Sequence, residues 1–148
     1  MNPQPWSHLP NAAHIDRILA SVKEHPEVWD AAWDAARYAA RNAIMDAARD
    51  AARYAARNAI MDAARDATRV AARDAIIDAA GNSAWYAARH AARYAIMALI
   101  AWDDCAHYLD LSSAKLEIWA KLSEKPECLL LLPAVKAFEK IDEMELTA

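Results

Sequence analysis

The stretch Asp34–Arg49 reads DAARYAARNAIMDAAR, and Asp50–Arg65 repeats the same sixteen residues. A third, diverged copy follows at Asp66–Gly81, DATRVAARDAIIDAAG. The copies share a four-residue unit, in which two residues that are mostly Ala precede two that are mostly Arg, Asp, Asn or aromatic. Ala, Arg and Met favour helix, and the whole chain holds a single Gly. The repeat therefore predicts an all-α protein, a helical hairpin or bundle whose long repeat helices are closed by short terminal helices.

The four-residue period also predicts how these helices pack. Four residues turn an α-helix by about 400°, so the Ala pair drifts by about 40° per unit and winds around the helix axis. A period longer than 3.6 residues favours right-handed crossing of neighbouring helices over a left-handed heptad seam. Bulky residues recur at multiples of four and are expected to pack in the core: Tyr38, Tyr54, Val70, Tyr86, Tyr94, Ile44, Ile60, Ile76 and Ile96.

Turn and capping signals predict the parts of one domain, residues 1–148. These parts are an irregular arm, an N-terminal helix, the repeat helices and the C-terminal helices, at residues 1–10, 11–25, 26–110 and 111–148. The arm holds three Pro, and we expect Trp6 to pin it. Asn11 is expected to be the N-cap of the N-terminal helix.

Helix boundaries inside the repeat region follow from Pro and Gly. Pro26 suits the first turn of a helix, and Gly81 suits the left-handed residue that ends one. Asn82 or Ser83 is then expected to cap a second long helix that runs to about Leu109.

Three signals place the C-terminal helices. Ser112 or Ser113 is expected to cap a helix that reaches about Ser123. Pro133 is expected to kink the last apolar segment or to start a new turn, and the residues after Glu143 are expected to fray.

The predicted helix lengths do not match. Residues 27–80 as one helix would reach about 80 Å, whereas residues 84–109 reach only about 40 Å. Either the long helix is broken near Asn42 or Asn58, or a second copy of the chain covers its excess length. We favour a break within one domain, and we expect a homo-oligomer in both cases.

Composition restricts the class of protein. The net charge of −4 argues against nucleic-acid binding, which usually needs a basic surplus. Cys105 and Cys128 are too few for a disulfide framework and have no zinc-site spacing, so we expect two buried thiols and no metal. The chain shows no signal peptide, no membrane span and no cofactor motif, and we expect a cytoplasmic protein.

Arginine supplies the basic charge of the repeat region, because no Lys occurs between Lys23 and Lys115. The guanidinium group binds carboxylates and phosphates with two parallel hydrogen bonds, which Lys cannot do. Candidates for contacts to an anion or to a neighbouring helix are Arg37, Arg41, Arg53, Arg57, Arg89 and Arg93. Alternatively, the arginines have no binding role and reflect a GC-rich coding sequence, since Ala, Arg and Asp codons are all GC-rich, together with expansion of the repeat.

The segment after the repeat, Ala101–Tyr108, reads AWDDCAHY and is the densest polar cluster. On a continuous helix, Asp103 and His107 would share one face. Catalysis is not indicated, because His107 lies at i+2 from Cys105 and points away from it. We therefore predict no catalytic residue and treat Trp102, Asp103, Asp104 and His107 as an acidic and aromatic surface that meets a basic partner protein.

The sequence resembles a group of alanine-rich bacterial and phage proteins that includes immunity proteins of polymorphic toxin systems. The resemblance rests on LPNAAHIDRILASVKEHPE, on the AARDAAR tandem, and on IMALIAWDDCAHYLDL followed by LLLLPAVKAF. It implies a small all-α inhibitor that binds a cognate toxin, or a host defence protein in a phage setting, and neutralises it by occlusion without chemistry of its own. Two alternatives stay open: a phage protein that sequesters an anionic signalling nucleotide, and a self-assembling structural protein.

Overall fold

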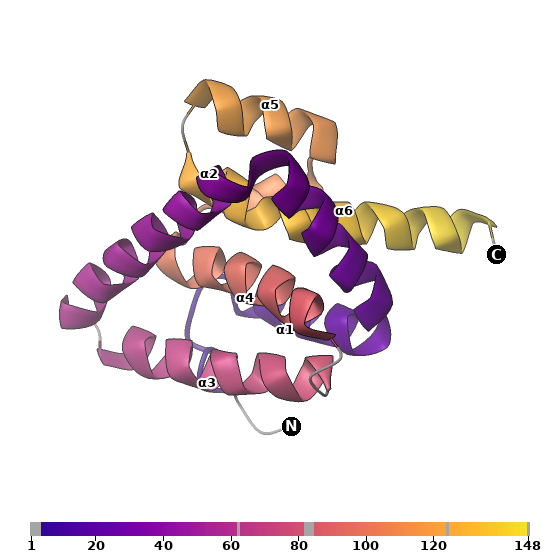
Figure 1. Cartoon of the computed structure of the whole chain (residues 1–148). Coiled ribbons are helices and arrows are strands. Elements are labelled where there is room, and N and C mark those ends of the chain that lie inside the picture. The colour runs from indigo at the N-terminus through magenta and orange to yellow at the C-terminus, as the bar shows by residue number, and fades with distance from the viewer. Residues whose placement is uncertain (1–3, 62, 82–84, 124, 148) are drawn as a thin grey trace.

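The computed structural model describes residues 4–61, 63–81, 85–123 and 125–147, without the side chains of residues 38–41, 55–61, 63–66 and 120–123 (Figure 1). These described residues form helices and turns and no strand, which confirms the all-α prediction. In chain order the elements are α1 (Ala12–Glu24), α2 (Pro26–Met61), α3 (Ala63–Ala80), α4 (Tyr86–Ala101), the 3₁₀ helix η2 (Ala106–Asp110), α5 (Ser113–Ser123) and α6 (Pro126–Thr147).

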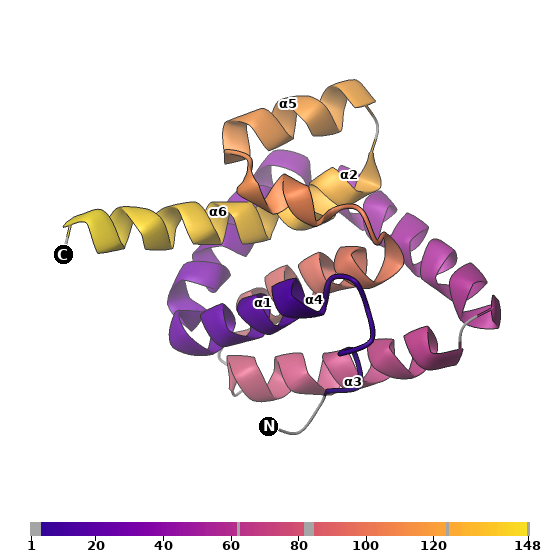
Figure 2. The ribbon, with the colours of Figure 1, turned by 180° about the vertical axis from the view of Figure 1, so that it is seen from behind.

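The repeat region is divided between two helices rather than one. α2 ends at Met61 and α3 begins at Ala63, so the predicted break falls close to Asn58. α2 also changes direction along its length and arches over α4, while α3 returns on the other side (Figures 1 and 2). α4 contacts α1, α2, α3 and α6, and therefore lies at the centre of the fold. The excess helix length is thus covered within the chain, and self-association stays a prediction that light scattering tests.

The buried alanines of α2 follow the winding that the four-residue period predicts. Ala32 and Ala36 are the second residues of their pairs, whereas Ala47 and Ala51 are the first residues of theirs, and all four are buried. Ala36 and Ala47 are eleven residues apart, which is close to three helical turns of about 3.6 residues each. The buried position therefore shifts from the second to the first residue of the Ala pair along α2, as the drift of the pair around the helix requires.

Large side chains anchor a core in which Ala permits close helix contact. Trp29 is fully buried on α2, and its ring meets that of Phe138 on α6 edge to face at 5.4 Å. Such aromatic pairs add about 0.5–1.5 kcal/mol to the burial of their area. Further buried anchors come from α1, α4 and α6: Ile15, Ile18, Ile96, Leu99, Leu130, Leu131, Leu132 and Val135.

The prediction that the recurring bulky residues form the core is correct only in part. Ile44, Ile76 and Ile96 are buried and Tyr94 is half-buried. Sixteen residues rotate a helix by about 160° net, so equivalent residues of successive copies face different directions. Accordingly, three of the predicted core residues are exposed: Tyr54 (42%), Val70 (49%) and Tyr86 (61%). Two side chains lie outside the described part of the chain: Tyr38 and Ile60.

The N-terminal arm is pinned to the helices, as predicted. Trp6 is buried, and its Nε1 donates a hydrogen bond to the Oδ1 atom of Asp16 at 2.8 Å. The hydroxyl of Thr68 on α3 donates to the carbonyl oxygen of Pro5 at 3.0 Å. Thr68 stands where the first two copies of the repeat have Ala36 and Ala52, so this contact belongs to the diverged copy alone.

Asn11 is the N-cap residue of α1, as predicted, but its side chain does not cap that helix, and the second repeat helix ends earlier than predicted. The Asn11 side chain makes no capping hydrogen bond to α1. Its Nδ2 instead donates to the carbonyl oxygens of Leu99, at 2.9 Å, and of Trp102, at 3.1 Å. These bonds satisfy carbonyls that a continuing helix would use, and Trp102 is extended. Helix α4 therefore ends at Ala101 instead of running to Leu109.

The remaining boundary signals have mixed outcomes. Gly81 has a φ of 81° and ends α3 as predicted, while Asn82 and Ser83 lie outside the described residues. Ser112 accepts a hydrogen bond from Lys115 N at 3.2 Å and caps α5.

Of the two alternatives for Pro133, the start of a new turn is wrong, while a kink stays a prediction. Helix α6 continues through Pro133 as a single element, so no new turn starts there. The helix extends to Thr147 instead of ending near Glu143, and the Thr147 hydroxyl lies 3.2 Å from the carbonyl oxygen of Glu143.

Candidate functional site

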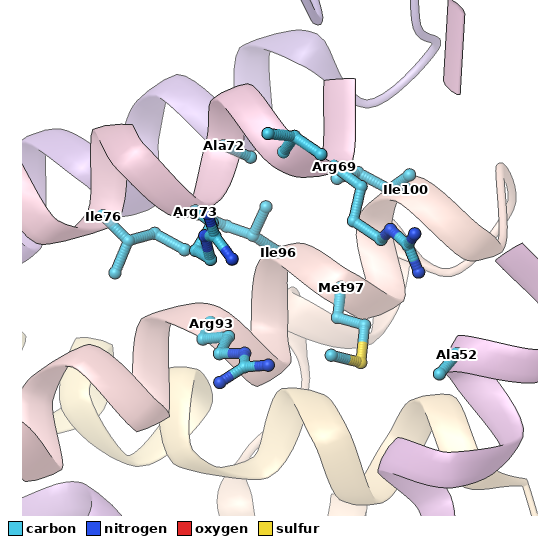
Figure 3. A pocket seen from close by; sticks show the side chains of 10 residues that line it. Ala52, Arg69, Ala72, Arg73, Ile76, Arg93, Ile96, Met97 and Ile100 are labelled. Carbon is cyan, nitrogen blue, oxygen red and sulfur yellow. The ribbon is translucent and has the colours of Figure 1, made fainter. Parts of the chain in front are cut away.

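Three neighbouring hollows lie where α3 and α2 flank α4. The first hollow, of about 230 Å³, lies between α3 and α4 (Figure 3). The second, of about 200 Å³, shares Arg73, Ile76 and Arg93 with the first. The third, of about 250 Å³, lies between α2 and α4 and shares His90 with the second. The hollows share lining residues around α4, and we refer to them together as the arginine groove.

The arginine groove has a basic rim and an apolar base. Ile76 and Ile96 are buried between α3 and α4, whereas Arg69, Arg73 and Arg93 are exposed. Figure 3 shows the guanidinium groups of these three arginines around the opening between the two helices. Two more arginines complete the lining of the second and third hollows: Arg89 and Arg37.

No Asp or Glu is among the described residues that line the groove. Arg73 Nε forms a long ion pair with the Oδ1 atom of its neighbour Asp74 at 3.9 Å, with both side chains mostly exposed. Such exposed pairs contribute little, about 0–1 kcal/mol. The groove thus concentrates positive charge in a chain whose net charge is −4.

Helical spacing brings these arginines to one face. On α4, Arg89, Arg93 and Met97 are separated by four residues each and lie on the same side of the helix. On α3, Arg69 and Arg73 are likewise four residues apart and face α4. Like charges at this spacing repel each other and do not stabilise an isolated helix. An anion bound in the groove would relieve that repulsion.

Arg89 is the least exposed arginine of the groove. Its Nη2 donates to the carbonyl oxygen of Gly81 at 3.2 Å, and its guanidinium carbon lies 5.1 Å from the centre of the Tyr86 ring. Its Nε is buried and has no hydrogen-bond partner within the described part of the chain. A buried N–H without a partner costs free energy unless a bound group accepts its hydrogen bond.

An aromatic cluster forms the other end of the groove. The ring of Trp33 on α2 lies 5.6 Å from His90 and 5.0 Å from Tyr94, both on α4. Burial lowers the pKa of His90, and the positive charges of Arg93, Arg37 and Arg89 lower it further. The lowered pKa keeps His90 neutral near pH 7, mainly because the ring is partly buried and in addition because three arginines surround it.

The structure brings together three of the six predicted arginines, Arg37, Arg89 and Arg93. Arg53 is exposed and lines none of the three hollows. The side chains of Arg41 and Arg57 lie outside the described residues.

The prediction missed Arg69 and Arg73, which only the return of α3 beside α4 brings to the groove. Their spacing of four residues on the third copy was the available sequence signal. That spacing occurs throughout the repeat, so it identifies these two arginines only when the start of α3 is known.

The predicted acidic and aromatic surface has a different geometry from the one expected. Because α4 ends at Ala101, Asp103 and His107 do not share a helix face, and that expectation is wrong. Asp103 and Asp104 are exposed in the turn between α4 and η2. His107 is exposed, and its Nδ1 lies 2.8 Å from the carbonyl oxygen of Asp104.

Trp102 is half-buried rather than exposed. Its ring stacks on that of Tyr54, with 5.5 Å between the centres. The turn thus combines a packed aromatic pair with two exposed carboxylates. We call Tyr54, Trp102, Asp103, Asp104 and His107 the exit-turn surface.

The two cysteines are buried as predicted. Burial raises the pKa of Cys105 to about 12 and that of Cys128 to about 11, and the charge of Glu127 adds to both shifts. Cys105 Sγ also lies 3.5 Å from the carbonyl oxygen of Ala98, at the end of α4. Thiols with such pKa values are poor nucleophiles and metal ligands.

The fold and the groove define the class as an all-α protein with an arginine-lined surface groove. No family model, no curated protein and no solved structure matches the chain. Among the described helices, none is long and apolar enough to cross a membrane. The described residues also contain no group of three or more His, Cys, Asp or Glu side chains that would hold a metal ion.

Proposed function

We propose that the protein is a non-enzymatic binding protein that captures an anionic ligand in the arginine groove and withdraws it from solution. The observation that carries this proposal is the lining of the groove, which has five arginines and no carboxylate among its described residues. Guanidinium groups bind phosphates and carboxylates through charge-assisted, often paired, hydrogen bonds. Arg89, whose Nη2 donates to the carbonyl oxygen of Gly81, adds a further positive charge to this lining.

Calorimetry and thermal unfolding with sodium tripolyphosphate test the proposal. The anion should bind and raise the Tm, and its affinity should fall as NaCl is raised, because the exposed arginines are screened. Replacing both Arg73 and Arg93 with Ala should weaken binding at least about tenfold, the effect of one lost charge-assisted hydrogen bond.

Replacement of both Arg49 and Arg53 with Ala is the matched control, since it also removes two positive charges and both residues are exposed on α2 and line none of the hollows. An equal loss of binding in this control would mean that overall charge, not the groove, holds the anion. Absence of binding by the unmodified chain would refute anion capture altogether.

A second candidate function is the neutralisation of a partner protein at the exit-turn surface, in the manner of an immunity protein. The observation that favours it is the stacked pair of Tyr54 and Trp102 beside the exposed side chains of Asp103 and Asp104. Aromatic residues flanked by charges are common at interface hot spots, and carboxylates suit a basic partner such as a nuclease-type toxin.

The test is a pull-down with the product of a neighbouring toxin gene. Replacing Asp103 and Asp104 with Ala should reduce capture of the partner and leave the Tm unchanged, because both side chains are exposed. A lower Tm with unchanged capture would make these residues structural and remove this candidate.

A further inference from the structure

We propose that the ligand of the arginine groove is a nucleotide, with its phosphates at Arg73 and Arg93 and its base in the hollow formed by Trp33, His90 and Tyr94. This inference rests on the proposed anion capture and specifies the ligand. It is carried by the juxtaposition of a basic hollow and an aromatic hollow along the same helix.

The aromatic hollow fits a flat, apolar group. Its lining contains the rings of Trp33, His90 and Tyr94, together with Ile44, Met45 and the side chain of Arg37. The three rings lie within 5.0–6.2 Å of one another, so they form one continuous aromatic wall. Nucleobases of every kind stack on such side chains because each has a π-face.

The basic hollow adjoins the aromatic one directly. His90 lines both hollows, while Arg73, Arg89 and Arg93 line the basic one. On α4, His90 and Arg93 are separated by three residues, about 4.5 Å along the helix axis. A base and its attached phosphates would therefore reach both hollows at the same time.

The size of the groove agrees with a ligand larger than a simple anion. Ligand sites usually enclose about 300–1,000 Å³. Each hollow alone is smaller than that, at about 200–250 Å³, whereas adjoining hollows together reach the range. A bare phosphate chain would leave the aromatic hollow empty.

Calorimetry with ATP, adenosine and sodium tripolyphosphate, all without divalent metal, separates the contributions of base and phosphates. ATP should bind at least about tenfold more tightly than tripolyphosphate, and adenosine should bind weakly. Equal affinities for ATP and tripolyphosphate would overturn the nucleotide assignment and leave anion capture intact. No binding of either would overturn both proposals. Tighter binding of hexaglutamate than of ATP would point to an acidic peptide instead and would also overturn the assignment.

Two variants localise the base. Tyr94→Leu should weaken ATP about tenfold and leave tripolyphosphate unchanged. Because Tyr94 packs on Trp33, its replacement can also disturb the core, so a second variant at an exposed residue is needed. Met45→Trp is this second variant, since Met45 is 46% exposed and a larger ring there would fill the hollow and weaken the binding of ATP. Unchanged ATP affinity in Met45→Trp would place the base elsewhere and refute this pose.

Discussion

The side-chain amide of Asn11 donates a hydrogen bond to the backbone carbonyl oxygen of Leu99, 88 positions later in the chain, over 2.9 Å. The same nitrogen donates to the carbonyl of Trp102 at 3.1 Å, and Asn11 is only 3% exposed. One buried amide therefore joins the start of α1 to the end of α4. This contact fixes where α4 stops and where the exit turn begins.

Replacement of Asn11 with Ala should destabilise the protein by about 1–3 kcal/mol, because the carbonyls of Leu99 and Trp102 both lose the donor that Asn11 supplies, and the Leu99 contact is buried. Urea unfolding followed by circular dichroism measures the change. Asn11→Asp is the matched control: it keeps the shape but cannot donate when ionised, so it should be at least as destabilising. A neutral effect of both substitutions would mean that the amide does not hold the end of α4.

Replacement of Thr68 with Ala should cost about 0.5–1.5 kcal/mol, even though it restores the residue of the other two copies. The Thr68 hydroxyl is the donor to Pro5 that ties the N-terminal arm to α3. Hydrogen exchange should show faster exchange of the backbone amides at residues 6–9, with little change in α6. Thr68→Val keeps the volume and removes the donor, so an arm that stays protected in this variant would contradict the role assigned to the hydroxyl.

The free protein should lose stability as the pH falls below 6.5, through His90. The pKa of His90 is lowered from 6.5 by burial and by Arg93, Arg37 and Arg89. Below pH 6.5 the unfolded chain binds a proton that the folded chain takes up only at lower pH, so unfolding becomes more favourable. Urea midpoints measured from pH 8 to pH 5 should fall less steeply in His90→Gln. Parallel curves for the two proteins would show that His90 does not contribute.

Binding of an anion should reverse this effect, on the condition that the groove is the binding site. A bound anion offsets the positive charges around His90 and raises its pKa, so binding takes up protons and strengthens as the pH falls towards 6. Calorimetry of tripolyphosphate in buffers of different ionisation enthalpy measures this uptake. The proton uptake should be smaller in His90→Gln, where only the protons exchanged by tripolyphosphate itself contribute. An identical uptake in both proteins would place the anion away from His90.

The thiols of Cys105 and Cys128 should not react with Ellman's reagent in the folded protein at pH 8. Burial raises their pKa values to about 12 and about 11, so almost no thiolate exists at that pH. Both should react once urea unfolds the chain, at the rate of unfolding. Rapid reaction of the native protein would mean that the end of α4 opens locally.

Much of the fold could be predicted from local sequence because the signals are local. The four-residue Ala unit specifies helix, and its drift predicts the change of buried register between Ala36 and Ala47. Pro26 and Gly81 act through their own backbone restrictions, so they mark helix ends without tertiary information.

The arginine groove could be predicted only in part. The sequence singled out Arg37, Arg89 and Arg93, because Arg replaces Lys throughout the repeat region. It could not add Arg69 and Arg73 or the ring of Trp33, since these reach the groove only when α2 and α3 fold back along α4. The exit-turn residues were identified, but their geometry was wrong because the end of α4 depends on Asn11.

The sequence by itself determined the helical class, the winding of the alanine strip and the local helix boundaries at Pro26 and Gly81, because these depend on backbone preferences and on the angle per residue. The tertiary structure alone decided that α2 ends at Met61, that α4 ends at Ala101, and that arginines from three helices share one groove. In a chain of near-identical repeats, every four-residue unit has the same local preference, so only long-range contacts such as Asn11 to Leu99 and Thr68 to Pro5 distinguish one unit from the next.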